Sequence, residues 1–160
     1  MSGRSTGGHT TDLRAYLFAL APTLVVVAVA PGLATLPGPG VGPLWVAGPP
    51  LVACGLGLVG WAVHSFARAG VTPSPVRTPV RLAVTGVLAH TRNPLYLGTV
   101  LAAAGVGLTL DAAVVLGYAG LLALVYHLLA VYHEEPALRA TFGDSYVRYC
   151  ETVPRWLPRP

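Results

Sequence analysis

The sequence predicts an all-α, polytopic membrane protein with four transmembrane helices, a C-terminal helical hairpin and short amphipathic cytoplasmic helices. The first observation is composition: 54% of the 160 residues are hydrophobic and only 10% are charged. A chain of this length cannot hide so much apolar surface in one soluble core. The second is four apolar runs of roughly bilayer-spanning length. We place these runs at residues 13–36, 44–66, 94–110 and 111–133.

The third observation is the distribution of positive charge. All ten basic residues are arginines, and they lie before the first run, between the second and third runs, and after the fourth. By the positive-inside rule, this pattern places both termini in the cytoplasm. The expected location is the cytoplasmic membrane of a bacterium. The net charge of +4 is therefore explained by the topology of the chain in the membrane. It gives no reason to predict a nucleic-acid partner.

No internal repeat divides the chain, so residues 1–160 are expected to form one domain. Residues 1–12 are rich in Gly, Ser and Thr and are expected to be disordered. Residues 134–160 should form a cytoplasmic segment at the membrane interface. Two cysteines, Cys54 and Cys150, make neither a disulfide framework nor a metal pattern, so no metal site is predicted.

The first run, residues 13–36, is longer than the apolar part of a signal peptide and is interpreted as a membrane helix. The second run carries small residues that allow helix backbones to approach closely. These are Ala53, Gly55, Gly57 and Gly60. The connection at residues 69–93 contains three prolines, so it cannot be one long helix, and its apolar residues predict that it packs on the bundle.

The third and fourth runs are expected to form a hairpin in which Pro94 occupies the first turn of one helix and Asp111 caps the next. After the fourth run, Pro136 should begin a short amphipathic helix that Gly143 ends. A second short helix would place Tyr146 and Tyr149 one turn apart, and these aromatic residues are expected at the membrane interface.

Two polar segments interrupt this apolar pattern, at residues 92–98 and at Glu134 and Glu135. Ionisable groups at the edge of a membrane helix indicate function by default. We expect the two segments to meet in one site. At 3.6 residues per turn, Glu134 shares the inward face of its helix with His127 and Ala130. Glu135 is rotated by about 100° from that face and is expected to cap the helix that begins at Pro136.

The order of these motifs resembles the isoprenylcysteine carboxyl methyltransferase family and its relatives among phospholipid methyltransferases. The resemblance covers residues 82–158. It rests on the Arg-Asn-Pro-Leu-Tyr-Leu-Gly segment, a helical hairpin, the two glutamates, and the residues that follow them, which are Leu138, Phe142, Gly143, Tyr146, Tyr149, Val153 and Pro154. The resemblance implies an integral membrane enzyme that uses S-adenosyl-L-methionine at the cytoplasmic side to methylate a lipophilic small molecule or lipid.

The resemblance also implies a cofactor site, in which Glu134 binds the polar end of the cofactor and His90 partly replaces a missing aromatic residue. The candidate cofactor-binding residues are Leu82, Ala83, His90, Arg92, Asn93, Pro94, Leu95, Tyr96, Gly98 and Glu134. The candidate catalytic residues are His127, as a proton acceptor, and Glu135. A structural role for His127, bonded to a neighbouring helix, is left open. Either Arg92 or Arg139 is expected to take the cofactor carboxylate.

Ala130 stands where the carboxyl methyltransferases carry a substrate-binding arginine. This difference favours a neutral or amine-bearing acceptor over a carboxylate. Two alternatives remain open from the sequence: an NADPH-dependent membrane reductase related to sterol reductases, and a non-catalytic membrane protein on the same scaffold. The oligomeric state is also left open.

Overall fold

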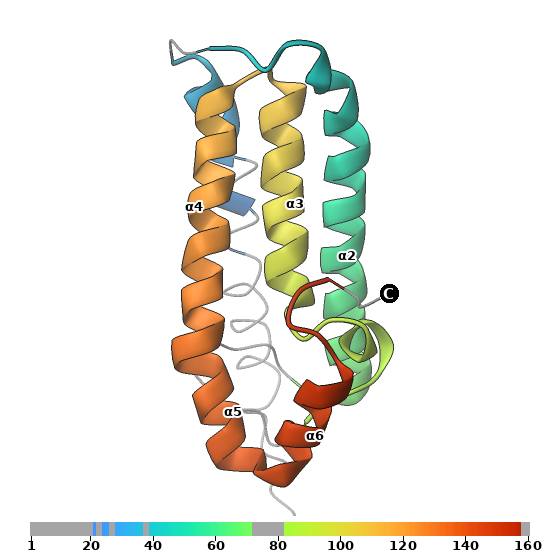
Figure 1. Ribbon diagram of the computed structural model, residues 1–160. Coiled ribbons are helices and arrows are strands. Elements are labelled where there is room, and N and C mark those ends of the chain that lie inside the picture. Colours follow the sequence, from blue (N-terminus) through green and yellow to red (C-terminus); the bar gives the residue numbers. More distant parts are fainter. Residues whose placement is uncertain (1–20, 22–23, 26–27, 37–38, 72–81, 158–160) are drawn as a thin grey trace, which may run out of the picture.

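The computed structural model describes residues 21, 24–25, 28–36, 39–71 and 82–157. Three long helices lie side by side in alternating direction (Figure 1). They are α2 (Gly48–Ala69), α3 (Pro94–Thr109) and α4 (Ala113–Leu129). The shorter elements are the 3₁₀ helices η1 (Gly42–Ala47) and η2 (Gly86–Ala89), the π-helical segment η3 (Ala130–Glu134), α5 (Glu135–Phe142) and α6 (Asp144–Thr152). The described residues contain no strand, which confirms the all-α prediction.

Two continuous helical stretches are long and apolar enough to cross a membrane. They are Gly42–Ala69 and Ala113–Phe142, with mean hydropathies of 1.7 and 2.1, while α3 is a shorter apolar helix. The described residues thus contain two candidate spans and one shorter helix, where the sequence predicted four spans over the whole chain. Much of the predicted first span, residues 13–36, and all of residues 1–12 lie outside the described residues; residues 28–34 are helical.

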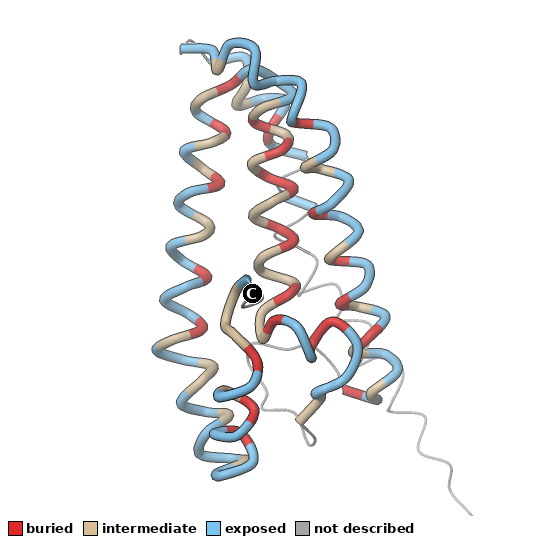
Figure 2. The backbone as a smooth tube through the Cα atoms, turned by 45° about the vertical axis from the view of Figure 1, so that its right-hand side comes forward, coloured by how far each residue is buried: buried red, intermediate tan, exposed pale blue. Residues whose placement is uncertain are grey.

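Burial follows the packing of these helices on one another. Figure 2 shows buried positions recurring along the sides of the long helices that face their neighbours. In contrast, large apolar side chains of α4 such as Leu121 and Leu124 are more than half exposed. Apolar side chains directed away from the bundle are what a helix in contact with lipid presents.

Glycines set the close approach of α2 to α3. A Cβ atom on Gly55 would lie 2.5 Å from the Ala102 backbone nitrogen and 2.6 Å from the Gly98 carbonyl oxygen. Gly98 itself faces Gly55 and Val59. The predicted close-packing role is therefore confirmed for Gly55. It is wrong for Gly57 and Gly60 within the described part of the chain, where a Cβ atom at either position would meet no heavy atom within 4 Å.

The difference between Gly55 and Gly57 allows the α2–α3 interface to be tested with two matched variants. Gly55→Ala should lower the free energy of unfolding in detergent by about 1 to 3 kcal/mol, because backbone atoms of α3 cannot move aside as a side chain can. Gly57→Ala, two residues later on the same helix, should be neutral or slightly stabilising, since alanine favours a helix by up to about 1 kcal/mol over glycine. Thermal unfolding of both variants makes the comparison. Equal effects of the two substitutions would contradict the packing described.

Asp111 does not cap α4 as predicted. Ala112 occupies the N-cap position without a side-chain cap bond, and Asp111 has a φ of +51°. Its carboxylate instead accepts hydrogen bonds from the backbone N–H groups of Val41 and Gly42, the latter at 3.0 Å. The prediction failed because aspartate tolerates the left-handed region. That conformation sends its side chain across to the loop before η1, where it ties that loop to the α3–α4 hairpin.

The fourth predicted run does not stop near His133. The helix continues through η3 into α5 and ends at Phe142, so the short helix predicted after Pro136 exists but is joined to α4 without a break. In η3 the Glu135 N–H donates to the Ala130 carbonyl oxygen, a π-type bond. Proline has no N–H to donate, and a wide turn immediately before Pro136 lets the helix pass this residue. Gly143, with a φ of +52°, ends α5 as predicted.

The last helix folds back on the connection that precedes α3. Tyr146, Tyr149 and Val153 form a buried cluster against which Leu82 and Leu138 pack. Tyr146 and Tyr149 are 2% and 8% exposed, so they pack inside the protein, and their position at the membrane interface stays a prediction. The predicted packing of the connection on the bundle is confirmed for its described part, because Val87 and Leu88 are buried against Ala62 of α2.

Candidate functional site

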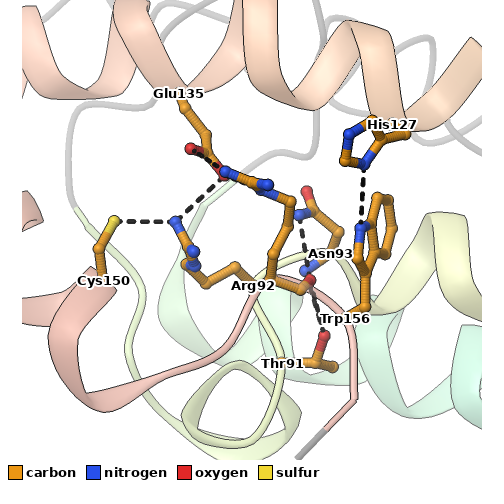
Figure 3. A network of polar contacts seen from close by, with 8 residues as sticks. Thr91, Arg92, Asn93, His127, Glu135, Cys150 and Trp156 are labelled. Atoms are coloured by element: carbon orange, nitrogen blue, oxygen red, sulfur yellow. Dashed lines mark hydrogen bonds and ion pairs between the residues drawn. The ribbon is translucent and has the colours of Figure 1, made fainter.

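Three segments far apart in the sequence meet at one end of the bundle. They are the loop before α3 with its first turn (residues 88–96), the junction of η3 and α5, and the chain after α6 (residues 153–156). Figure 3 shows their polar side chains directed toward one another. The two polar segments singled out from the sequence are thus brought together, as expected.

Backbone carbonyl groups of the C-terminal segment hold the loop before α3. The Arg92 N–H donates to the Pro154 carbonyl at 3.0 Å. The Thr91 hydroxyl and the Asn93 side-chain amide both donate to the Arg155 carbonyl, each at 3.2 Å. These bonds satisfy polar groups of a turn that is too irregular to satisfy them itself. They also fix the rotation of the Asn93 amide.

The Tyr149 side chain ties α6 to the beginning of the same loop. Its hydroxyl donates to the Leu88 carbonyl at 2.7 Å. Burial raises the pKa of Tyr149, so its hydroxyl keeps its proton and remains a donor. The position of the loop therefore depends on α6.

Glu135 is the centre of an ion cluster. Arg155 binds it with two parallel bonds, Nε to Oε1 at 2.6 Å and Nη2 to Oε2 at 3.0 Å, and Arg92 Nη1 lies 3.1 Å from Oε1. The side chains of Arg92 and Glu135 are only 12% and 13% exposed. The hydrogen bond to Glu135 raises the pKa of Arg155, so this cation stays charged. The predicted capping role of Glu135 is wrong, because its carboxylate turns toward these guanidinium groups.

Arg92 has a second contact in this cluster. Its Nη1 lies 2.9 Å from the Cys150 sulfur, as Figure 3 shows. Its Nε is buried and has no hydrogen-bond partner among the described residues. A buried donor without a partner requires an explanation, and a bound ligand or water would supply one.

Glu134 has a different environment. Its carboxylate accepts a hydrogen bond from the Tyr96 hydroxyl of α3, and the Tyr96 ring stacks on Tyr126 of α4 at a centroid distance of 4.3 Å. Ala130, one turn before Glu134, is completely buried. The predicted inward face is confirmed for these two residues, whereas His127, the third predicted member, is exposed. The adjacent carboxylates therefore differ, since Glu135 is matched by two cations and Glu134 is held by a neutral phenol.

His127 contacts the C-terminal segment. The Trp156 Nε1–H donates to His127 Nδ1 at 3.3 Å. An indole N–H can only donate, so Nδ1 must be unprotonated and the neutral ring must carry its proton on Nε2. In this arrangement neither ring nitrogen offers a free lone pair. The predicted role of His127 as proton acceptor therefore requires Trp156 to leave.

The remaining predicted residues pack around the site. Leu82 joins the buried tyrosine cluster, Ala83 and Leu95 pack on the Val87 cluster, and Pro94 is fully buried at the start of α3. His90 is exposed, with its ring 5.9 Å from that of Trp61, and Gly98 lies in the α2–α3 interface. Contacts with a cofactor stay a prediction for all of these residues.

Sequence reasoning missed the residues of the site that lie in the C-terminal segment. Arg155 and Trp156 supply side-chain contacts to Glu135 and His127, and Cys150 contacts Arg92. An arginine and a tryptophan near a membrane interface are ordinary for their position. The one available signal was the segment Val153–Pro154, which belongs to the motif order and marks where the chain turns back.

An open recess of about 280 Å³ adjoins the ion cluster and is lined by Val131, Glu135, Pro136 and Arg139. Because Glu135 and Arg139 are four residues apart, their opposite charges share one stripe of the helix. The amino-acid part of S-adenosyl-L-methionine carries an ammonium and a carboxylate. Of the charged residues that line the recess, Glu135 is matched by Arg92 and Arg155, so Arg139 is the one whose charge fits the carboxylate of such a zwitterion.

The chain resembles a known protein family. The phospholipid methyltransferase family model matches residues 44–145, from the 3₁₀ turn before α2 to the first turn of α6. This stretch contains the polar loop and both glutamates, while Tyr149, Arg155 and Trp156 lie beyond it. No curated protein and no solved structure matches the chain significantly. Neither the match nor the geometry supports the reductase alternative.

Proposed function

Because this chain belongs to the phospholipid methyltransferase family, we propose that it is an S-adenosyl-L-methionine-dependent methyltransferase embedded in the membrane. In this proposal it transfers a methyl group to a lipophilic small molecule or lipid at the cytoplasmic face. The observation that carries the proposal is the pair of unlike carboxylates at the end of a long apolar helix. Glu134 is held by a neutral phenol, whereas Glu135 is matched by two guanidinium groups.

The cofactor supplies an electrophilic methyl group on a positively charged sulfur. Glu134 would hold the cofactor ammonium, and Arg139 would hold its carboxylate from the recess beside Glu135. Tyr96 contacts Glu134 from the first turn of α3, and Asn93 is the N-cap residue of that helix; both are proposed to contact the cofactor. The residues of the chain mainly align the reacting atoms and exclude water, because a displacement at a methyl group needs little acid–base help.

The methyl acceptor is proposed to be neutral or to bear an amine. Ala130 is completely buried and carries no charge, so a carboxylate acceptor would find no cation one turn before Glu134. An amine or hydroxyl acceptor must lose a proton. His127 can take it through Nδ1 once Trp156 withdraws its N–H, which makes the C-terminal segment part of the catalytic cycle in this proposal.

The proposed orientation places both termini and the site on the cytoplasmic side, with residues 1–160 forming a single domain. The cofactor would arrive from the cytoplasm and the acceptor from the bilayer. The turn between α3 and α4 and the loop at residues 39–41 lie at the opposite end of the bundle from α5 and α6 (Figure 1), away from the polar site.

A methyl-transfer assay tests this function. The purified protein in lipid vesicles should move a labelled methyl group from S-adenosyl-L-methionine to lipophilic amines or hydroxyl compounds, and to water-soluble analogues at least about tenfold more slowly. The physical reason is that an acceptor enriched in the bilayer reaches the helices at high local concentration. Faster methylation of water-soluble acceptors across a broad panel would contradict the proposed entry from the bilayer.

A further inference from the structure

We propose that Arg155 is a positioning residue that assembles the cofactor site and makes its two adjacent glutamates unequal. This inference rests on the proposed function and deepens it. Arg155 lies ten residues beyond the stretch that matches the family, which ends at residue 145. It is also in the last segment that the structure describes, after α6.

Arg155 makes contacts with both its side chain and its backbone carbonyl group. Its guanidinium binds both oxygens of Glu135, a geometry that fixes the carboxylate in orientation as well as distance. Its backbone carbonyl accepts hydrogen bonds from Thr91 and Asn93. One residue thus joins the acid pair at the end of α4 to the loop that begins α3. No other described residue has a hydrogen bond to both of these segments in this way.

The two arginines also determine which of the two glutamates has a charge that is not matched by a cation. Two unpaired carboxylates next to one another would repel and would both attract a cation. Arg92 and Arg155 together outweigh the charge of Glu135, so the negative charge left for a ligand is that of Glu134. The side chain of Arg155 is 31% exposed, whereas that of Arg92 is 12% exposed. Arg155 is therefore the cation of the pair that can be changed with less damage to the fold.

A double-mutant cycle tests the inference. The dissociation constant of S-adenosyl-L-methionine is measured by calorimetry for the wild type, Arg155→Gln, Glu135→Gln and the double variant. We expect each single substitution to weaken binding about fivefold, and the double variant to bind no worse than about tenfold weaker, because the two side chains act as one unit. Independent roles would instead multiply to about 25-fold.

Two further variants separate positioning from simple stability. Arg155→Lys keeps the charge but loses the parallel bonds, so it should recover part of the affinity. Arg148→Gln removes an exposed arginine of α6 and should bind as the wild type does. Multiplying losses, or an Arg155→Gln variant that binds normally, would overturn the inference. If the wild type itself bound no S-adenosyl-L-methionine, the proposed function would fail first.

Discussion

Replacing Glu134 with Gln should weaken the binding of S-adenosyl-L-methionine by about 10- to 150-fold. The change preserves the shape of the side chain and removes one charge. Its expected cost is that of a charge-assisted hydrogen bond, about 1.5 to 3 kcal/mol. Stability should change little, because a glutamine oxygen can still accept the Tyr96 hydroxyl bond. Equilibrium dialysis with the labelled cofactor gives the affinity.

Glu151→Gln is the matched control, since Glu151 is an exposed acid of α6. It should leave the affinity unchanged. Glu135→Gln should cost about fivefold, less than Glu134→Gln, because its own charge is already matched by two arginines. Equal losses at the two glutamates, or a larger loss at Glu135, would mean that the unlike environments of the pair do not determine cofactor binding.

Glu135→Gln should instead have its largest effect on stability, with a loss of about 2 to 4 kcal/mol in the free energy of unfolding. The substitution leaves the Arg92 guanidinium without its counter-charge in a site where its side chain is only 12% exposed. Breaking one partner of a buried ion pair typically costs about 3 to 5 kcal/mol. We place the value lower because Arg155 is partly exposed and glutamine can still accept a hydrogen bond. Thermal unfolding in detergent measures it.

The double variant Glu135→Gln/Arg92→Met supplies the control for this second prediction. Methionine fills a similar volume without a charge, so the double variant should recover a large part of the stability lost by Glu135→Gln. A Glu135→Gln variant that unfolds at the wild-type temperature would show that the ion cluster does not stabilise the junction of α4 and α5.

The helical class and the meeting of the two polar segments could be predicted from the sequence, for a clear physical reason. Composition and the spacing of apolar runs determine which segments become long helices. The inward orientation of the Glu134 side chain was predicted correctly because the inward stripe that contains Ala130 continues into the π turn. Local periodicity carries this kind of information well.

The roles of Asp111, Glu135 and Arg155 could not be predicted in this way. Each is decided by a partner distant in the sequence: Val41 and Gly42 for Asp111, and Glu135 for Arg155. A helix wheel also fails at η3, because a π turn advances each residue by less than the 100° of an α-helix. That smaller rotation accumulates along the turn, so Glu134 stays near the inward stripe while Glu135 departs from the direction that the wheel predicts.

The measurement that tests the account most directly is a calorimetric titration of the purified full-length protein with S-adenosyl-L-methionine, and separately with NADPH. We expect saturable binding of S-adenosyl-L-methionine at one site per chain and no binding of NADPH. Binding of NADPH in its place would contradict the proposed function. So would the absence of any heat of binding when thermal unfolding shows that the protein is folded.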